Sequence, residues 1–239
     1  MVSMINRYIS IILVLIVLQS CDDEWIFDIP GCMDQNAINY DLNASSDNGS
    51  CYYEEMITEV IAIDSSSYDE WIYFSLELGE VVEILDIENS MDWDLGFKRN
   101  HIKTNGGISG EGSGCAIVDA TQSWTNESFE STMVVVDKEC QTDALIEGNI
   151  FTYEGCYNPI THLFSDCVKN PALDNWGSFD SGYHFNINNY RFFVKRADGV
   201  YVKFWLRGYY NINQEDAQIS ITYQTMFDTN SDNLELLLK

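Results

Sequence analysis

The chain has 239 residues, enough for one good-sized β domain or for a small module followed by a larger domain. Hydrophobic residues make up 46% and aromatic residues 13%, which excludes disorder for most of its length. Asp and Glu number 38 against 12 Lys and Arg, a formal net charge of -26. Such a surface repels phosphate backbones, so we expect no nucleic-acid partner.

The N-terminus has the features of a secreted lipoprotein. Residues 8–18 are apolar and follow Arg7, but the run is shorter than the ~20 residues of a transmembrane helix and fits a secretory signal. The next residues resemble a bacterial lipobox ending at Cys21, which predicts a signal peptide at 1–20 and lipidation of Cys21. Two or more acyl chains would anchor the protein to a membrane. We expect 21–30 to be a lipidated acidic linker.

The acidic residues that follow the lipidated cysteine indicate the final location. Asp22, Asp23 and Glu24 resemble the surface-export signal of Bacteroidota lipoproteins. The alternative is a simple solvated spacer. We therefore expect a lipid-anchored protein of the bacterial outer membrane, exposed on the cell surface.

Residues 31–54 are predicted to form a small module bracketed by cysteines. Its sequence GCMDQNAINYDLNASSDNGSC resembles a repeat of secreted Bacteroidota proteins, present here in one copy. A segment this short cannot bury a sufficient core. A disulfide between Cys32 and Cys51 would compensate by roughly 3 kcal/mol in the chain-entropy estimate.

The same module is a candidate calcium site. Oxygen ligands suit Ca²⁺, and the module offers Asp34, Asn39, Asp41, Asn43 and Asp47. The bidentate Glu of an EF-hand is absent. Alternatively, these Asp and Asn residues form turns by hydrogen bonding to their own backbone.

Residues 55–228 are predicted to be an all-β domain with antiparallel pairing, followed by a tail at 229–239. Short alternating runs rich in β-branched and aromatic residues lie between turn residues. The predicted strands are 57–63, 71–78, 81–87, 91–98, 132–137, 183–187, 191–196, 200–210 and 218–226. Apolar and polar or aromatic residues alternate within 200–207, as expected for a half-buried strand. Ala197-Asp198-Gly199 predicts a hairpin turn, and 165–173 is the one predicted helical turn. Glycines within 104–116 do not match a phosphate-binding loop and indicate close backbone approach or positive φ.

Two blocks of the β domain resemble the HmuY-like family, lipid-anchored haem-binding proteins of Bacteroidota. The first includes Trp71-Ile72-Tyr73-Phe74, then Trp93-Asp94-Leu95, then Arg99, Ile102 and Asn105 before the glycine-rich loop. The second is YRFFVKRADGVYVKFWLRGYYN (190–211) followed by QISITYQ (218–224). The resemblance covers roughly 57–226 and matches poorly at 117–182. It implies an antiparallel two-sheet domain that holds haem between two axial His or Met side chains from two loops.

The resemblance implies ligands in the poorly matched region. The family's second ligand lies just after a Trp-x-x-Phe segment, and the matching position here is Ser181, which departs from the pattern. The candidate haem ligands are therefore His162, His184 and Met133. Each has a structural alternative: a strand position for His184, an exposed loop for His162 and a core position for Met133. We interpret His101 as structural.

Four further cysteines predict disulfides in an exported chain. Cys115, Cys140, Cys156 and Cys167 allow three pairings, which the sequence alone does not rank. Our hypothesis is Cys115–Cys140 with Cys156–Cys167.

The expected function is non-catalytic binding of haem, or of a related tetrapyrrole, and its transfer to an outer-membrane receptor. No nucleophile motif indicates an enzyme. The alternative is a non-haem binding or adhesion lipoprotein on the same scaffold. For that alternative, four aromatic residues could form a sugar-stacking platform: Trp124, Tyr157, Trp176 and Tyr183. The same side chains could equally wall a haem pocket or fill a core.

Overall fold

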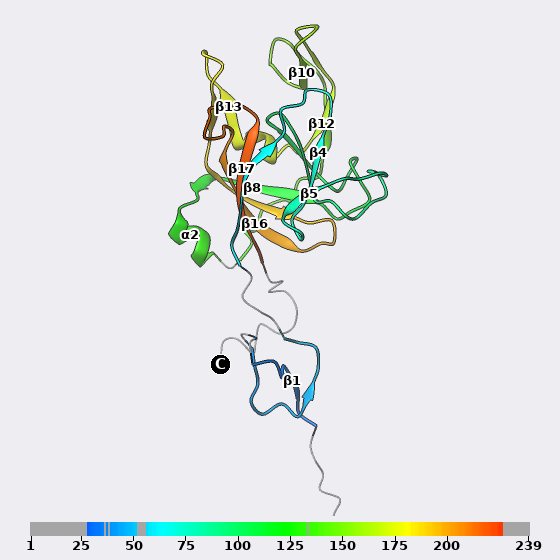
Figure 1. The fold of residues 1–239 in the computed structure, drawn as a ribbon, viewed down its shortest axis with the longest axis vertical. Coiled ribbons are helices and arrows are strands. Elements are labelled where there is room, and N and C mark those ends of the chain that lie inside the picture. Colours follow the sequence, from blue (N-terminus) through cyan, green and yellow to red (C-terminus); the bar gives the residue numbers. More distant parts are fainter. Residues whose placement is uncertain (1–27, 36, 38, 52–55, 133, 227–239) are drawn as a thin grey trace, which may run out of the picture. The chain divides into compact units, whose positions relative to one another are not determined.

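A computed structural model describes residues 28–35, 37, 39–51, 56–132 and 134–226. The chain divides into two compact units, Met1–Glu54 and Glu55–Lys239 (Figure 1). Among the described residues, no helix is both long and apolar enough to cross a membrane. The predicted signal peptide and Cys21 lie outside the described residues.

The first unit is a set of turns closed by a disulfide. Strands β1 (Pro30–Gly31) and β2 (Ser46–Asp47) form a short parallel pair. A disulfide joins Cys32 to Cys51, whose Cα atoms are 4.7 Å apart. Cys32 is buried, so the bridge occupies the interior of the module.

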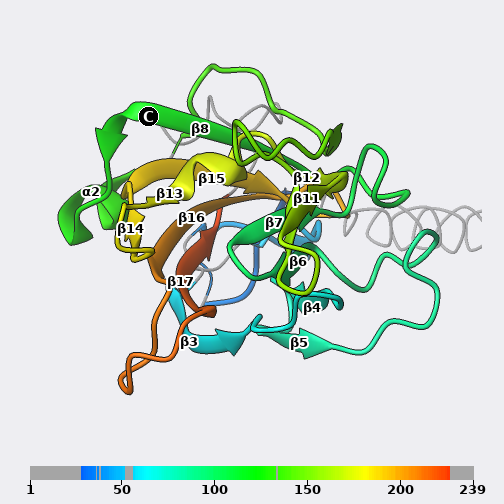
Figure 2. The same cartoon turned by 90° about the horizontal axis from the view of Figure 1, so that it is seen from above.

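The second unit is built on two antiparallel sheets, as the sequence predicted (Figure 2). In spatial order, the five-stranded sheet contains β3 (Thr58–Asp64), β17 (Gln218–Thr225), β16 (Tyr201–Gly208), β15 (Tyr190–Lys195) and β8 (Cys115–Ser123). The four-stranded sheet contains β5 (Glu80–Val82), β4 (Ile72–Ser75), β6 (Leu95–Lys98) and β7 (His101–Thr104). Their inner faces form one apolar core, which includes Phe74, Leu95, Phe97, Ile102, Phe192, Val194, Phe204, Leu206, Ile219 and Ile221.

Strand β16 is buried on both faces, whereas its alternating sequence predicted a half-buried strand. Val202, Phe204 and Leu206 face the core between the sheets. Trp205 faces a second apolar cluster, formed with Trp124 and with Phe129 of helix α2 (Asn126–Ser131). The prediction of one solvated face was wrong because α2 covers the outer face of the sheet.

The Trp-Asp pair of the first block connects the two sheets. The buried carboxylate of Asp94 accepts hydrogen bonds from the backbone N–H of Leu76 at 2.8 Å and of Ala197 at 2.8 Å. Leu76 follows β4, and Ala197 lies in the turn between β15 and β16. Gly199 in that predicted turn has φ +96°, a value that favours glycine.

Asn105 organises the glycine-rich loop. Its buried side-chain amide donates to the carbonyl oxygens of Ser90 and Trp93, at 2.8 and 2.9 Å. A Cβ atom at Gly112 or Gly114 would lie 2.4 Å from the carbonyl oxygen of Asn105. These glycines allow close backbone approach, and Gly107 in the same loop has φ +62°, so both roles expected from the sequence are present.

Three short antiparallel pairs extend from the sheets. They are β9 (Ala144–Ile146) with β12 (Cys167–Lys169), β10 (Cys156–Asn158) with β11 (Leu163–Ser165), and β13 (Gly177–Phe179) with β14 (Phe185–Ile187). The hairpins containing β10 and β13 project from the same end of the larger unit (Figure 1). Viewed from above, β13 and β14 lie on one side, and β11 and β12 on the other (Figure 2).

The structure contains the disulfides Cys115–Cys140 and Cys156–Cys167, with Cα–Cα distances of 5.5 and 5.2 Å. These are the pairs of our hypothesis. The first connects the start of β8 to the segment after α2, and the second closes the base of the β10–β11 hairpin.

Two predicted elements were wrong, and strands β7 and β8 were not predicted. Residues 134–137 form no strand; Val135 and Val136 instead pack against the α2 cluster. The segment 165–173 contains β12 rather than a helical turn, and the 3-10 helix η1 (Leu173–Trp176) begins where it was expected to end. The Asn170 side-chain oxygen accepts from the N–H groups of Ala172 and Leu173, which fixes the start of η1.

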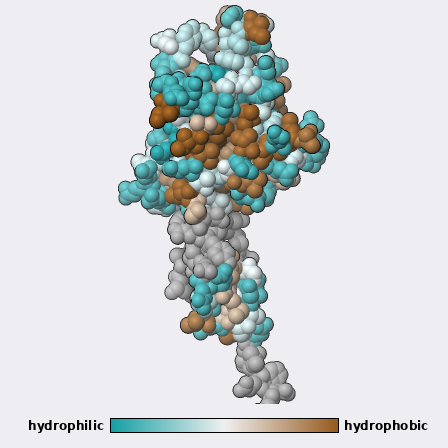
Figure 3. All heavy atoms as spheres, in the orientation of Figure 1, coloured by the Kyte–Doolittle hydropathy of each residue, from teal (hydrophilic) through white to brown (hydrophobic). Residues whose placement is uncertain are grey.

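Exposed apolar side chains are not confined to the projecting hairpins. The face shown in Figure 3 mixes apolar and polar residues over the larger unit. Ile61 of β3 and Val81 of β5 are exposed, and these are the edge strands of the two sheets. Apolar exposure alone therefore does not identify a binding site.

Candidate functional site

His162 lies in the turn of the β10–β11 hairpin, and its backbone is held in an unusual conformation. Its φ is +57°, in the left-handed region that few non-glycine residues adopt. Its N–H donates to the Asn158 carbonyl at 2.9 Å, and the Asn158 side-chain oxygen accepts from the N–H groups of Ile160 and Thr161. The turn therefore presents an exposed imidazole from a well-defined backbone.

The His162 ring is hydrogen bonded to a tyrosine on the same hairpin. Tyr157 Oη lies 2.8 Å from His162 Nδ1. Tyr157 is half-buried, and its ring packs against Phe164 of β11 at a centroid distance of 5.3 Å. These contacts fix the position of the tyrosine hydroxyl that meets His162.

His184 lies in the turn of the β13–β14 hairpin. Asp180 Oδ1 accepts hydrogen bonds from the N–H groups of Gly182 and His184, and these bonds lower the pKa of the Asp180 carboxyl. The exposed His184 ring stacks on Tyr210, with centroids 4.7 Å apart and an interplanar angle of 23°. Tyr210 Oη in turn accepts from the Phe185 N–H at 2.8 Å, which fixes the stacking ring.

An open hollow of about 410 Å³ adjoins His184. Its volume falls within the range of small-molecule sites. The lining residues come from the β13–β14 hairpin, the end of β16 and the following loop: His184, Phe185, Asn186, Ile187, Gly208, Tyr209, Tyr210 and Gln214.

Aromatic and cationic contacts extend from each hairpin into the domain. Tyr68 packs edge-on against Tyr157, with centroids 6.3 Å apart, and the Arg99 guanidinium lies 4.4 Å from the Tyr68 ring centroid. The positive charge of Arg99 is close enough to lower the pKa of Tyr209, although burial dominates and raises that pKa. On the side of the other hairpin, Tyr209 packs against Tyr210 at 5.2 Å, and Tyr210 stacks on His184.

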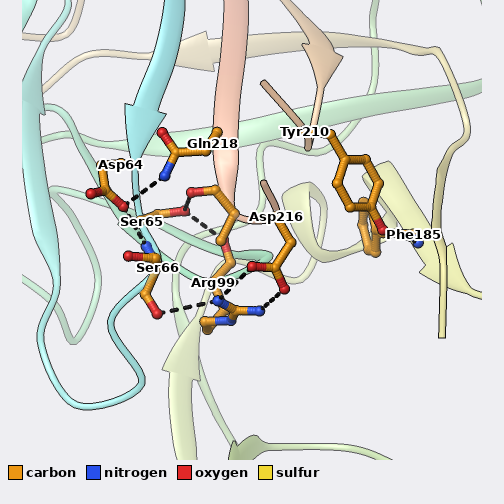
Figure 4. Close-up of polar contacts among 9 residues, drawn as sticks. Asp64, Ser65, Ser66, Arg99, Phe185, Tyr210, Asp216 and Gln218 are labelled. Atoms are coloured by element: carbon orange, nitrogen blue, oxygen red, sulfur yellow. Dashed lines mark hydrogen bonds and ion pairs between the residues drawn. The ribbon is translucent and has the colours of Figure 1, made fainter. Parts of the chain in front are cut away.

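Arg99 is the cation of this region, and loops close to both sheets hold it in place (Figure 4). It pairs with Asp216 and donates to the Ser66 carbonyl at 3.2 Å. The neighbouring Asp64 accepts from Ser66 and from Gln218, and these hydrogen bonds lower its pKa. Hydrogen bonding to Asp216 raises the pKa of Arg99 despite the desolvation of the guanidinium.

The buried hydroxyl of Tyr209 has no hydrogen-bond partner among the described residues. Its ring is 1% exposed and lies in an aromatic cluster with Trp176, Phe179 and Phe185. The β13–β14 hairpin is therefore attached to the domain by aromatic packing rather than by polar contacts of this hydroxyl.

The other predicted ligand positions are less informative. Met133 lies outside the described residues, and Ser181 is exposed in the β13–β14 turn. His101 is buried beside Asp174, with its Nδ1 3.4 Å from the carboxylate, which agrees with a structural role.

The sugar-stacking platform was wrong as predicted. Trp124 and Trp176 are each 1% exposed and belong to the two apolar clusters. Tyr157 is half-buried and Tyr183 is exposed. Because the two tryptophans are buried in the core, they are not available to stack on a sugar.

The calcium prediction gains no support from the structure. No group of three His, Cys, Asp or Glu side chains in the described ranges is placed to hold a metal ion. Asp41 accepts from the Asn43 N–H, Asp47 accepts from the Gly49 N–H, and Asn39 donates to the Ser50 carbonyl. These contacts match the alternative that Asp and Asn form turns.

Sequence reasoning missed several residues that support the two histidines. Tyr210 and Tyr68 carry no sequence signal that distinguishes them from core aromatics. Arg99 lay within the first matched block, but its neighbours Ser66 and Asp216 are far from it in the sequence. Only the fold brings them together.

Comparisons with known proteins agree with this architecture. The family described as HmuY protein matches residues 67–223, well over half of the chain. The chain belongs to the HmuY family. No curated protein matches the chain.

Solved structures show that the HmuY fold extends across the larger unit. An apo HmuY analogue of Tannerella forsythia matches with TM-score 0.53 and 20% identity, covering 74% of this chain and 98% of its own. A putative HmuY-like haem-binding protein of Bacteroides vulgatus matches with TM-score 0.52 and 17% identity, covering 73% and 93%. A putative lipoprotein of Bacteroides fragilis matches with TM-score 0.52 and 16% identity, covering 71% and 88%.

Proposed function

We propose that this HmuY-family protein binds haem, or a related tetrapyrrole, through the hairpins that carry His162 and His184, and that it does so without catalysis. One observation carries the proposal. Two exposed imidazoles lie in hairpin turns at the same end of the domain, and a tyrosine contacts each of them.

The chemistry of these residues fits the ligand. Haem iron accepts neutral imidazole nitrogens as axial ligands. His162 and His184 would supply them, and Met133 remains a candidate outside the described residues. Nearby aromatic side chains, including those around the hollow beside His184, suit the apolar faces of a flat macrocycle.

Titration with haemin tests this proposal. We expect the purified protein to shift the Soret band of haemin with a saturable one-to-one stoichiometry. His162→Ala and His184→Ala should each weaken binding, because each removes one axial ligand. His101→Gln is the matched control, since His101 lies beside Asp174 and away from the hairpin turns.

Two titration results would contradict the proposal. If both alanine variants titrate like the parent protein, the two histidines are not the ligands. If the parent itself gives no saturable shift, the protein is a non-haem binding or adhesion lipoprotein on the HmuY scaffold.

The proposal includes a lipid anchor and a partner. Lipidation of Cys21 would place the protein on the outer membrane, from which it would pass its ligand to an outer-membrane receptor. Mass spectrometry of the mature N-terminus tests the first point, and Cys21→Ala should release the protein from the membrane fraction. Haem transfer to receptor-containing outer-membrane vesicles would test the second point.

A further inference from the structure

The interaction of His162 with Tyr157 goes beyond a general binding surface. An imidazole that faces solvent ordinarily rotates about its side-chain bonds, yet this ring has a hydroxyl 2.8 Å from Nδ1. The hydroxyl belongs to a half-buried ring that packs against Phe164 at 5.3 Å and Tyr68 at 6.3 Å. The histidine is exposed, but its partner is fixed.

The backbone adds a second constraint. His162 adopts φ +57°, and its N–H donates to the carbonyl of Asn158. A non-glycine residue in this region is strained and persists only where the surrounding structure holds it there. The Cys156–Cys167 disulfide constrains the base of the hairpin, and the Asn158 side chain constrains its turn.

We propose that Tyr157 is a positioning residue that fixes the His162 ring and leaves Nε2 as the nitrogen that faces a metal centre. This inference rests on the proposed function. It specifies that His162 coordinates through Nε2 and that Tyr157 orients the ring to do so.

The proton arrangement follows from the chemistry of imidazole. A neutral ring that coordinates through Nε2 carries its proton on Nδ1. That N–H then donates to Tyr157 Oη at the observed separation. Hydrogen bonding of this kind fixes the tautomer and orientation of a ligating histidine and makes the ligand more basic, and its loss typically costs ~10- to 100-fold in affinity.

The two histidines differ in this respect. Tyr210 stacks on the face of His184 and uses its hydroxyl to accept from the Phe185 N–H. No described residue hydrogen bonds to the His184 ring. Tyr157→Phe is therefore expected to affect His162 and to leave His184 unchanged.

The test compares Tyr157→Phe with Tyr153→Phe. Tyr153 is a matched control, because it is 74% exposed and packs against the same Phe164 at 5.7 Å without contacting a histidine. Haemin titration should give roughly 10-fold weaker binding for Tyr157→Phe and parental binding for Tyr153→Phe. The low-spin ferric signal in electron paramagnetic resonance should persist in Tyr157→Phe and disappear in His162→Ala.

A second measurement uses the ligand-free protein. Long-range proton–nitrogen NMR correlations report the two ring nitrogens of each histidine. In Tyr157→Phe we expect the His162 Nδ1 resonance to move and the His184 resonances to stay. Tyr157→Leu provides a second variant with an apolar side chain if Tyr157→Phe does not fold.

The outcomes separate the two proposals. If His162→Ala loses binding while Tyr157→Phe titrates like the parent, the positioning role is wrong and the ligand assignment stands. If His162→Ala titrates like the parent, or the parent binds no haemin, both are overturned. An unchanged His162 Nδ1 resonance in Tyr157→Phe also overturns the positioning role.

Discussion

Asp94 is the residue whose contribution is easiest to isolate, because one buried carboxylate satisfies two backbone groups from different parts of the chain. Its oxygens accept from Leu76 and from Ala197. Burial raises the pKa of Asp94, and the two backbone hydrogen bonds oppose that rise. Asp94 therefore links the two sheets, although burial of its carboxylate carries a desolvation cost.

Replacing Asp94 with alanine should destabilise the domain by about 2–6 kcal/mol. The reason is that two buried N–H groups lose their acceptor, and each unsatisfied group costs ~1–3 kcal/mol. Urea unfolding measures the change. Asp92→Ala is the control, because Asp92 is exposed and hydrogen bonds only to Ser90 among the described residues. Equal destabilisation of both variants would contradict this account.

His101 is the residue that should make stability depend on pH near neutrality. Burial lowers its pKa, and the charge of Lys169 acts in the same direction, while Asp174 opposes both. The unfolded chain therefore binds this proton at a higher pH than the folded chain does. The free energy of unfolding must fall as pH falls from the ordinary histidine pKa of ~6.5 towards the lower folded value.

Comparison with His101→Gln isolates this effect. We expect the parent protein to lose stability relative to the variant as pH falls below ~6.5, because glutamine does not titrate. The neighbouring Asp174 has a lowered pKa, so its own loss of stability comes at more acidic pH. Urea midpoints at several pH values provide the measurement, and parallel curves for the two proteins would reject the explanation.

At the residue scale, the sequence indicated which residues are important better than it indicated which residues they contact. The disulfide partners lie within 25 residues of each other, and their pairing was among three possibilities for the larger unit. Asp94 and Arg99 were recognised in a family block, but Ala197 and Asp216 lie more than 100 residues away. Such contacts depend on the arrangement of the sheets, which no local pattern contains.

At the element scale, helix α2 is the feature that a strand-by-strand prediction missed. The segment is only six residues long, so hydrophobic periodicity gives almost no signal. Its start is nevertheless marked by a capping box, in which Thr125 and Ser128 exchange side-chain and backbone hydrogen bonds. Its end depends on Lys203, which comes from β16.

Lys203→Met should therefore destabilise the attachment of α2. Lys203 is 1% exposed, and its ammonium donates to the carbonyl oxygens of Phe129, Glu130 and Thr132. Removing the ammonium leaves these carbonyl oxygens at the C-terminal end of α2 without their hydrogen-bond donor, at a cost of about 2 kcal/mol. We expect that loss in urea unfolding, together with faster amide hydrogen exchange in α2.

Lys195→Met is the control for this prediction. Lys195 lies on the neighbouring strand β15, is half-buried and places its ammonium 5.6 Å from the Tyr201 ring. Loss of this contact should cost less than about 1 kcal/mol and leave exchange in α2 unchanged. If Lys203→Met behaves in the same way, the ammonium does not hold the helix end.

Four of the five strands of the larger sheet were predicted, but β8, with nine residues, was not. Strands β3, β15, β16 and β17 have six to eight residues and clear apolar alternation, and each overlaps a predicted run. The strands of the β10–β11 and β13–β14 hairpins have three residues each, and of these only β14 overlaps a predicted run, 183–187. Their stability comes from Cys156–Cys167 and from packing on Tyr209, so the sequence placed candidate ligands without showing the hairpins that hold them.

At the scale of the whole molecule, the net charge of -26 opposes folding. Like charges come closer together in the compact state, and dissolved salt screens them over a Debye length that falls from ~30 Å at 0.01 M to ~8 Å at 0.15 M. We expect the melting temperature to rise with sodium chloride over this range. A flat or falling profile would mean that the repulsion is already balanced by local ion pairs.

The same experiment tests calcium binding without confusing it with screening. Calcium and magnesium chloride at equal ionic strength screen charge equally, but only a specific site distinguishes the ions by size and ligand number. Since Asp41 and Asp47 accept from neighbouring backbone N–H groups, we expect the two salts to raise the melting temperature equally. A larger effect of calcium that EDTA reverses, and that Asp41→Asn with Asp47→Asn removes, would instead establish the site in the cysteine-bracketed module.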